Sequence, residues 1–262
     1  MIPLERGSLR ARLGDGAEDR ARILALRATA FPHRDGSAEI WETLDEACRH
    51  VMVEGEGGAL LATFRVLEMA SGRDLPHSYC ARHYDLAPLA GYSRPLAEMG
   101  RFCLAAPPGA LAADALRLGW AAMARLVDSC GAGLVLGCTS FPGADWWPHR
   151  AALALLAQDH LGPAGLRPGL RAAEVVAYPR LAGAPGDRRV ALAGLPSLLR
   201  SYLAMGAWVS DHAVVDRQLD TLHVLTCLPV ERVPPARAMS LRALAALPMR
   251  APAVIARSAA AC

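Results

Sequence analysis

The chain of 262 residues has no lysine and no asparagine, so all 28 of its Lys and Arg positions are arginines. The absence of lysine excludes a Schiff-base lysine and a P-loop lysine, and the absence of asparagine excludes N-linked glycosylation. The formal net charge is only +3, so we expect no nucleic-acid partner. The fixed arginine charge is compatible with an acidic protein partner or with anionic lipid head groups.

Long apolar runs, a signal sequence and paired cysteines are also missing. No stretch approaches the ~18 apolar residues of a membrane-spanning helix, and the longest uncharged one, Ser129–Ala144, is broken by glycines and a proline. The charged N-terminal part does not have the apolar segment of a signal peptide. The seven cysteines form no Cys-x-x-Cys pair, which indicates a reducing environment. We expect a cytoplasmic protein whose contact with membranes, if any, is peripheral.

With 53% hydrophobic residues, the chain has enough apolar material for one large core. Its periodicity predicts helices and strands in alternation. We expect helices at 17–30, 114–129, 147–158 and 195–205, and strands at 50–54, 59–67, 96–105, 131–138, 173–178, 207–209, 213–215 and 222–228.

The order of these segments predicts how they connect. Strands 96–105 and 131–138 flank a helix and so predict a parallel βαβ unit, whereas 50–54 with 59–67 and 207–209 with 213–215 predict hairpins. One domain over residues 1–232 follows, with a C-terminal tail over 233–262. We expect that tail to be flexible and solvated; the alternative is that its arginines lie on an anionic membrane surface.

Two opposite charges stand inside one apolar strand, 96–105. Glu98 and Arg101 are costly there without partners, and a spacing of three places them on opposite faces unless a β-bulge intervenes. They form either a buried ion pair that positions the strand or part of a reactive site in which Glu98 is a general base.

A second charged group consists of Asp211, Asp216 and Asp220, around an expected hairpin. Aspartate is typical of turns, but clustered carboxylates also bind cationic amines. Both interpretations are open on these residues alone.

Metal ligands and nucleophiles have weaker support. His77, Cys80 and His83 have ligand-like spacing, but no second cluster supplies a fourth ligand, so we predict no metal site. Cys138 has the residue type of a nucleophile. Its place at the end of an apolar strand favours a buried structural cysteine instead.

Two sets of motifs resemble known acyltransferases. The N-terminal part, with Arg27-x-x-x-Phe31, Asp45, Arg65 and Glu98-x-x-Arg101-Phe102, resembles the pattern of acyl-homoserine lactone synthases. The segments 137–143 and 206–232 resemble the ornithine lipid biosynthesis acyltransferases, which N-acylate ornithine. This second resemblance covers most of the chain.

The resemblance implies an α/β (α+β) protein with the acyl-CoA N-acyltransferase (GNAT-like) fold, a mixed β-sheet flanked by helices. It implies transfer of a (3-hydroxy)fatty acyl group from acyl carrier protein to the α-amine of L-ornithine, which gives lyso-ornithine lipid. No cofactor is expected beyond the phosphopantetheine of the carrier. Substrate-binding roles follow for Arg27, Phe31, Asp45, Arg65, Asp211, Asp216 and Asp220.

The chemistry of the residues is compatible with this reaction. Glu98 would take the proton of the attacking amine, with Arg101 beside it. Backbone N–H groups freed where strands 96–105 and 131–138 separate would polarise the thioester carbonyl, with Thr139 or Ser140 as auxiliary donors. The same gap would admit the pantetheine arm.

The connection Ala105-Ala-Pro-Pro-Gly-Ala-Leu111 differs from the glycine-rich pyrophosphate loop of many CoA-dependent enzymes. Its two prolines have no amide N–H to donate. This favours a donor without the CoA diphosphate, as acyl carrier protein is.

Three alternatives are kept. An acyl-homoserine lactone synthase would use S-adenosylmethionine in place of ornithine, and the segment 206–232 argues against it. Another acceptor, such as glycine or lysine, would keep the fold and the reaction. A non-catalytic module that binds an acyl chain or a carrier protein would have neither base nor turnover.

Overall fold

A computed structural model of the chain describes residues 3–105, 109–178 and 187–246. Its centre is a ten-stranded sheet with the order β1-β2-β3-β4-β6-β7-β12-β11-β9, in which β10 also pairs with β12. The strands are β1 (Leu4–Arg6), β2 (Leu9–Leu13), β3 (Arg49–Glu54), β4 (Leu60–Met69), β6 (Leu96–Leu104), β7 (Leu134–Pro142), β9 (Val175–Ala177), β10 (Trp208–Val209), β11 (His212–Asp216) and β12 (Thr221–Pro229). A small second sheet pairs β5 (Tyr84–Asp85) with β8 (Gly169–Leu170).

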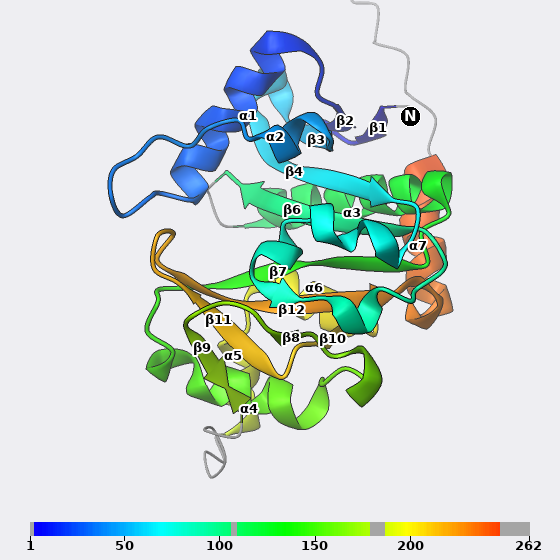
Figure 1. Ribbon diagram of the computed structural model, residues 1–262. Coiled ribbons are helices and arrows are strands. Elements are labelled where there is room, and N and C mark those ends of the chain that lie inside the picture. The colour runs from blue at the N-terminus through cyan, green and yellow to red at the C-terminus, as the bar shows by residue number, and fades with distance from the viewer. Residues whose placement is uncertain (1–2, 106–108, 179–186, 247–262) are drawn as a thin grey trace, which may run out of the picture.

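Helices cover this sheet and connect its strands (Figure 1). They are α1 (Gly16–Ala30), α2 (Thr43–Glu46), α3 (Ala110–Cys130), α4 (Arg150–Asp159), α5 (Arg188–Ala193), α6 (Ser197–Ala204) and α7 (Pro235–Ala246). Short 3₁₀ turns occupy Glu56–Gly58, Gly72–His77, Cys80–Arg82, Ala87–Leu89, Trp147–His149, Ala164–Leu166 and Val230–Arg232. The predicted mixed sheet flanked by helices is confirmed.

The β6–α3–β7 unit is the one parallel connection among the paired strands of the described residues, as the sequence predicts. Its ladder is short, because the pairing of the two strands is confined to Leu96–Glu98 with Leu134–Leu136. On its other side β7 pairs with β12 along its whole length, from Leu134 to Pro142. The sheet is therefore continuous through β7 and β12 but divided between the later halves of β6 and β7.

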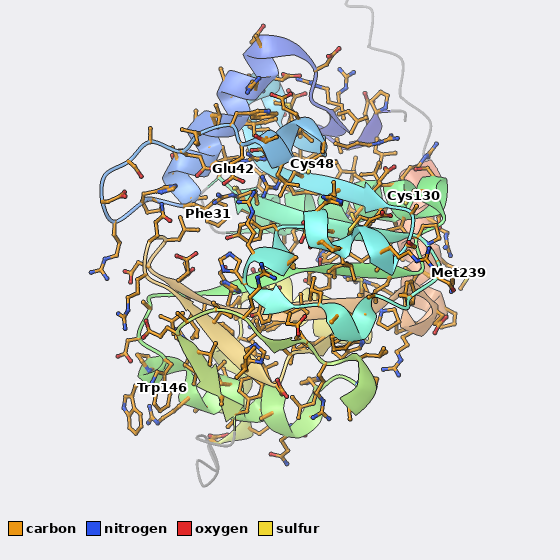
Figure 2. The ribbon with its side chains drawn as sticks, viewed as in Figure 1. Phe31, Glu42, Cys48, Cys130, Trp146 and Met239 are labelled. Atoms are coloured by element: carbon orange, nitrogen blue, oxygen red, sulfur yellow. The ribbon has the colours of Figure 1, made fainter. Side chains whose placement is uncertain are left out.

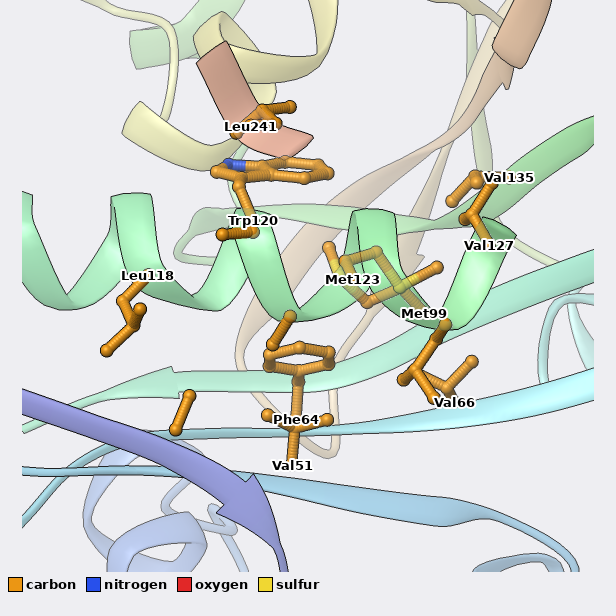
Figure 3. Close-up of a cluster of buried hydrophobic side chains, with 14 of the residues drawn as sticks. Val51, Phe64, Val66, Met99, Leu118, Trp120, Met123, Val127, Val135 and Leu241 are labelled. Carbon is orange, nitrogen blue, oxygen red and sulfur yellow. The ribbon is translucent and has the colours of Figure 1, made fainter. Parts of the chain in front are cut away.

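The main core lies between the sheet and α3 (Figure 3). Phe64 and Met99 from the strands pack with Met123 on the side of the helix that faces the sheet, whereas the Trp120 ring lies on the other side of the helix; all four side chains are buried. Burial of each such side chain contributes roughly 1.5–3 kcal/mol. Leu241 of α7 closes this core from outside, next to Trp120.

The opposite face of the sheet is covered by the segment 71–92, which has no long helix. Its side chains Leu75, Tyr84 and Leu89 are almost fully buried and belong to one cluster with Leu136 of β7 and Leu225 of β12. This packing lays Tyr79 and Cys80 over the centre of the sheet.

Three details differ from the sequence-based expectations. β10 and β11 do not form a hairpin: both pair with β12, at Thr226–Cys227 and at Thr221–His223, so they run along it as one interrupted strand. The Ser210 side chain explains the interruption, since its hydroxyl donates to the His212 carbonyl and accepts from the Leu225 N–H. The hairpin β1–β2 and the short helix α5 were not predicted.

Part of the expected tail is packed on the domain. α7 begins at Pro235, buries Leu241 and forms an ion pair between Arg242 and Asp128 of α3, with 2.8 Å between Nη2 and Oδ1. Packed structure therefore extends past the boundary predicted at residue 232. The rest of the predicted tail, 247–262, lies outside the described residues. Within the described ranges no helix is both long and apolar enough to cross a membrane.

Candidate active site

A cavity of about 340 Å³ lies where β6 and β7 separate. Its polar lining comes mainly from the face of the sheet under the segment 71–92, and its apolar lining from the face under α3 and α6. The polar residues include Arg65, Tyr79, Glu98, Arg101, Cys138, Thr139, Ser140, Asp216 and His223; the apolar ones include Phe102, Leu104, Leu116, Leu198 and the ring of Tyr202. One space thus joins charged groups to a surface that suits a hydrocarbon chain.

Two backbone features determine where β6 and β7 separate: a last close approach at Gly137 and a bulge beyond it. A Cβ on Gly137 would stand 2.3 Å from the Met99 carbonyl oxygen, so only glycine allows β7 to pass β6 this closely. Beyond this point β6 bulges: Arg101 has a φ of 51°, and the register with β4 shifts between Thr63 and Arg65. In a regular strand, a spacing of three would place Glu98 and Arg101 on opposite faces. With this bulge they can lie on the same face of the sheet.

Glu98 sits at the polar wall, 3% exposed. Its Oε2 accepts the Tyr79 N–H at 2.8 Å and its Oε1 accepts the Cys80 N–H at 2.7 Å. Burial raises the pKa of Glu98, and the hydrogen bonds from Cys80 and Tyr79 only partly offset this rise. A carboxylate with a raised pKa is a stronger base than an ordinary glutamate.

Arg101 does not neutralise Glu98; no ion pair joins these two described residues. Its Nε is 3.6 Å from Glu39 Oε1, and its Nη2 is 3.9 Å from Glu42 Oε1. Its guanidinium carbon lies 5.3 Å from the centre of the Phe31 ring. Both distances to carboxylates exceed hydrogen-bond length, so the guanidinium keeps donors for a ligand. Figure 2 shows Phe31 at the end of α1 and Glu42 at the start of α2.

Arg27 and Asp45 lie behind the cavity in a closed network with Arg65. Asp45 Oδ1 accepts from Arg27 Nη1 and from Arg65 Nη1, both at 2.9 Å. The His50 ring joins them, since Arg27 Nη2 is 3.3 Å from Nδ1 and Nε2 is 2.9 Å from the Asp45 carbonyl. Burial raises the pKa of Asp45, but the two arginines outweigh it and the pKa is lowered. Of Arg27, Asp45 and Arg65, only Arg65 lines the cavity; the predicted Phe31 lines it as well.

The three predicted aspartates are not brought together. Asp216 lines the cavity, where its Oδ1 accepts the N–H groups of Gln218 and Leu219 at 3.0 Å. Asp211 instead pairs with its neighbour His212 at 2.8 Å. Asp220 accepts the Ala144 N–H at 3.1 Å and lies 3.3 Å from Arg34 Nη1. The turn interpretation fits all three, since the Asp216 carboxylate also accepts from the turn that follows it. Asp216 alone lines the cavity, so the ligand interpretation is kept for it.

Thr139 and Ser140 both line the cavity but differ in availability. The Thr139 hydroxyl is 3.0 Å from that of Thr226 and is buried. Ser140 is half-buried and, by strand alternation, shares a face with Cys138. Ser140 is therefore the freer hydroxyl donor of the two.

Sequence reasoning missed Tyr79, His223 and Tyr202 as cavity residues. They come from three distant segments, and only the packing of 71–92 and of α6 and the register of β12 bring them to β6 and β7. Cys80 was considered as a metal ligand; its N–H holds Glu98 and its Sγ lies 3.5 Å from Cys138 Sγ. The described part of the chain has no group of His, Cys, Asp and Glu arranged to hold a metal ion.

Residues 26–107 match the family model described as an acetyltransferase (GNAT) domain. The mixed sheet flanked by helices is the GNAT-like fold that the sequence predicts. The predicted resemblance to ornithine acyltransferases is also confirmed, because four curated relatives bear the name L-ornithine N(alpha)-acyltransferase.

The relative from Rhodobacter capsulatus is 33% identical over 172 residues, which are 66% of this chain and 65% of that protein. The chain thus spans slightly less than two thirds of its length. The relative from Brucella abortus is 28% identical over 255 residues, 87% of this chain and 86% of that protein. Among solved structures, an N-acyl amino acid synthase from uncultured soil microbes has 12% identity and a TM-score of 0.48, covering 85% of this chain and 92% of its own.

Proposed function

We propose that the protein transfers a (3-hydroxy)fatty acyl group from acyl carrier protein to the α-amine of L-ornithine, with lyso-ornithine lipid as the product. The observation that carries this proposal is the cavity between β6 and β7, where buried Glu98 faces the same space as an apolar wall. A thioester acyl donor needs the apolar wall, and an amine acceptor needs the base. The names of the sequence relatives support ornithine as that acceptor.

The charged lining fits the two ends of ornithine. Arg101 has no hydrogen-bonded carboxylate among its described neighbours at Nε, so it can bind the carboxylate of the substrate. Asp216 receives only backbone N–H groups in its hydrogen bonds and can bind the δ-ammonium group. Held at both ends, ornithine presents its α-amine between them.

The reaction requires a proton acceptor and a stabilised oxyanion. Glu98 takes the proton of the α-amine, directly or through one water molecule. Strand N–H groups that face the gap beyond Glu98 and Leu136, where the pairing of β6 with β7 ends, polarise the thioester carbonyl, with the Ser140 hydroxyl as a further donor. The acyl chain lies along Leu116 and Leu198, away from the charges.

The carrier-protein donor has its support in the sequence. The connection before α3 contains Pro107 and Pro108, which offer no N–H to a CoA diphosphate. Residues 106–108 lie outside the described structure. The fixed positive charge of the arginines is compatible with an acidic carrier as partner.

The test is an acyl-transfer assay with purified protein. 3-Hydroxyacyl carrier protein and the corresponding acyl-CoA are offered as donors, each with ornithine, glycine, lysine or S-adenosylmethionine. We expect release of free carrier thiol that depends on ornithine, together with an N-acylornithine. Activity with another acceptor alone would overturn ornithine as the substrate, and preference for acyl-CoA would overturn the carrier. Acyl binding without transfer to any acceptor would indicate a binding module.

A further inference from the structure

Cys138 occupies the reacting end of the cavity. It lies on β7 two residues after Leu136, the last residue of the parallel ladder, and it lines the cavity while remaining half-buried. The other thiol nearby, that of Cys80, is fully buried, and its Sγ atom lies 3.5 Å from the Sγ atom of Cys138. Only Cys138 is thus open to a substrate, and Cys80 can donate its S–H to it.

A histidine completes the arrangement. His223 is 2% exposed, lines the same cavity, and pairs in register with Ser140, two residues from Cys138 on the same face of the sheet. Its Nδ1 lies 3.3 Å from the Tyr84 hydroxyl oxygen, while that hydroxyl donates to the His223 carbonyl at 2.9 Å. Nδ1 is therefore assigned as the protonated nitrogen.

The other nitrogen of this ring is unoccupied. His223 Nε2 is buried and has no hydrogen-bond partner in the structure as described. A buried ring nitrogen with a free lone pair, in a cavity that the Cys138 thiol also lines, is of the type that activates a cysteine nucleophile. Buried polar atoms normally have partners, so this one calls for a function.

Electrostatics agree with the geometry. The hydrogen bond with Cys80 lowers the pKa of Cys138 to about 6, with further lowering by His223 and opposition from burial. Burial lowers the pKa of His223, but the neighbouring Cys138 outweighs it and the pKa is raised. By contrast, burial raises the pKa of Cys48 to about 12.

We propose that Cys138 is a catalytic nucleophile that receives the acyl group as a thioester before the amine does. This inference rests on the proposed acyl transfer and deepens it. Cys138 gives its proton to His223 Nε2, and its sulfur bonds to the acyl carbon while the bond from that carbon to the pantetheine sulfur breaks. The departing thiolate takes the proton back from His223.

The second half of the reaction restores the enzyme. The amine nitrogen bonds to the acyl carbon, the bond from that carbon to Cys138 breaks, and Glu98 takes the amine proton. Cys138 leaves as a thiolate, stabilised by the Cys80 thiol. The proton taken by Glu98 then passes to this thiolate, so that the Cys138 thiol and the Glu98 carboxylate are both regenerated. No oxidant, metal or additional substrate is consumed.

The experiment is mass spectrometry of the intact protein after mixing with 3-hydroxyacyl carrier protein in the absence of any amine. We expect one acyl group per molecule, mapped to Cys138, released by hydroxylamine and by ornithine. Cys138→Ala should fail to form the adduct and lose about 100-fold or more in turnover, with a thermal unfolding midpoint near that of the wild type. Cys130→Ala, at the far end of α3, is the matched control and should form the adduct normally.

The outcomes separate the two proposals. Ornithine acylation by a wild-type enzyme that never carries an acyl group, or by Cys138→Ala at an undiminished rate, would overturn the nucleophile and leave the proposed function standing. An adduct on Cys138 that ornithine does not discharge would support the nucleophile and overturn ornithine as acceptor.

Alkylation offers a readout that needs no acyl donor. In reducing buffer, iodoacetamide should modify Cys138 before Cys48 or Cys130. Cys80→Ala should slow the modification, and Cys80→Ser, which keeps a hydrogen-bond donor, should restore most of the rate. Faster modification of Cys48 or Cys130 than of Cys138, or no effect of Cys80→Ala, would contradict an activated thiol.

Discussion

The structure has two groups of buried charged side chains, one around Asp45 and one in the cavity around Glu98, and they differ in their partners. In the network behind β3 and β4, Asp45 accepts from two arginines at 2.9 Å, and Arg27 and Asp45 are almost completely buried. In the cavity, Glu98 accepts from the backbone N–H groups of Tyr79 and Cys80, and among the described residues Arg101 has carboxylates no nearer than 3.6 Å. Charges that satisfy one another fix the position of α1, whereas charges that do not are left for a ligand.

The sharpest way to break this comparison is Glu98→Gln. The carboxylate is the proposed base, so its replacement should lower turnover by roughly 10²–10⁴-fold. The amide also places an NH₂ group against one of the two backbone donors, so thermal unfolding is measured alongside. A folded variant that keeps turnover within a few-fold of wild type would make Glu98 a purely structural residue.

Asp45→Asn tests the other group of charges, the network of Asp45 with Arg27 and Arg65. Removing the charge leaves Arg27 buried without a carboxylate partner among the described residues and Arg65 with Glu42 alone, 3.5 Å away, which should cost about 3–5 kcal/mol of the free energy of unfolding. Urea denaturation measures it. A change below 1 kcal/mol would show that the network is not what holds α1 in place.

The same network predicts an acid sensitivity. Burial raises the pKa of Asp45, but Arg65 and Arg27 lower it more, so the net pKa lies below its ordinary 3.8. The ion pairs therefore stabilise the fold fully above that pH, and the contribution is lost as the pH falls through the lower folded value. Asp45→Asn should lose less stability than wild type over that interval in acid titrations followed by circular dichroism.

Asp216→Asn should have a smaller effect, confined to the substrate. Loss of its charge should raise the KM for ornithine about tenfold, the equivalent of ~1.4 kcal/mol for one charge-assisted contact, and leave kcat almost unchanged. Norvaline, which has no δ-amine, should be used equally well by variant and wild type. Asp211→Asn, whose carboxylate pairs with His212 outside the cavity, is the matched control; an equal rise in KM there would remove the special role of Asp216.

The least effect is expected at the surface. Asp128→Asn breaks an ion pair with Arg242 in which both side chains are about half exposed, 44% and 54%. Such pairs contribute about 0–1 kcal/mol, so urea denaturation should show a loss within that range and no change in acyl transfer. A loss above 2 kcal/mol would mean that docking of α7 depends on this pair rather than on Leu241.

The same contrast shows how much a sequence can predict. Glu98 and Arg101 are identifiable because charges interrupt an apolar strand, and the βαβ unit because a helix of the right length joins two such strands. The network is different: nothing local to Arg27 or Asp45 tells that each will be neutralised by a residue 18 or more positions away. Arg27 and Asp45 belong to the same motif pattern as Arg101, the one that resembles acyl-homoserine lactone synthases, and that pattern does not distinguish a paired charge from a free one.

The residues that the sequence did not predict depend on packing across the sheet. Tyr79 and Cys80 reach Glu98 only because Leu75, Tyr84 and Leu89 bury the segment 71–92. His223 reaches Cys138 only through the register of β12 with β7. Cys138 was interpreted as structural from its apolar strand, and its exposure to a cavity follows from Gly137 and the bulge at Arg101, which determine where β6 and β7 separate.

The central claim, that this cavity joins an acyl thioester to the α-amine of ornithine, is tested most directly by the position of the acyl group in the product. Purified protein is incubated with 3-hydroxyacyl carrier protein and ornithine, and the product is fragmented by tandem mass spectrometry. The account predicts acylation at the α-nitrogen alone, because Asp216 holds the δ-ammonium group away from Glu98. Acylation at the δ-nitrogen, or no acylornithine from a folded protein, would contradict it.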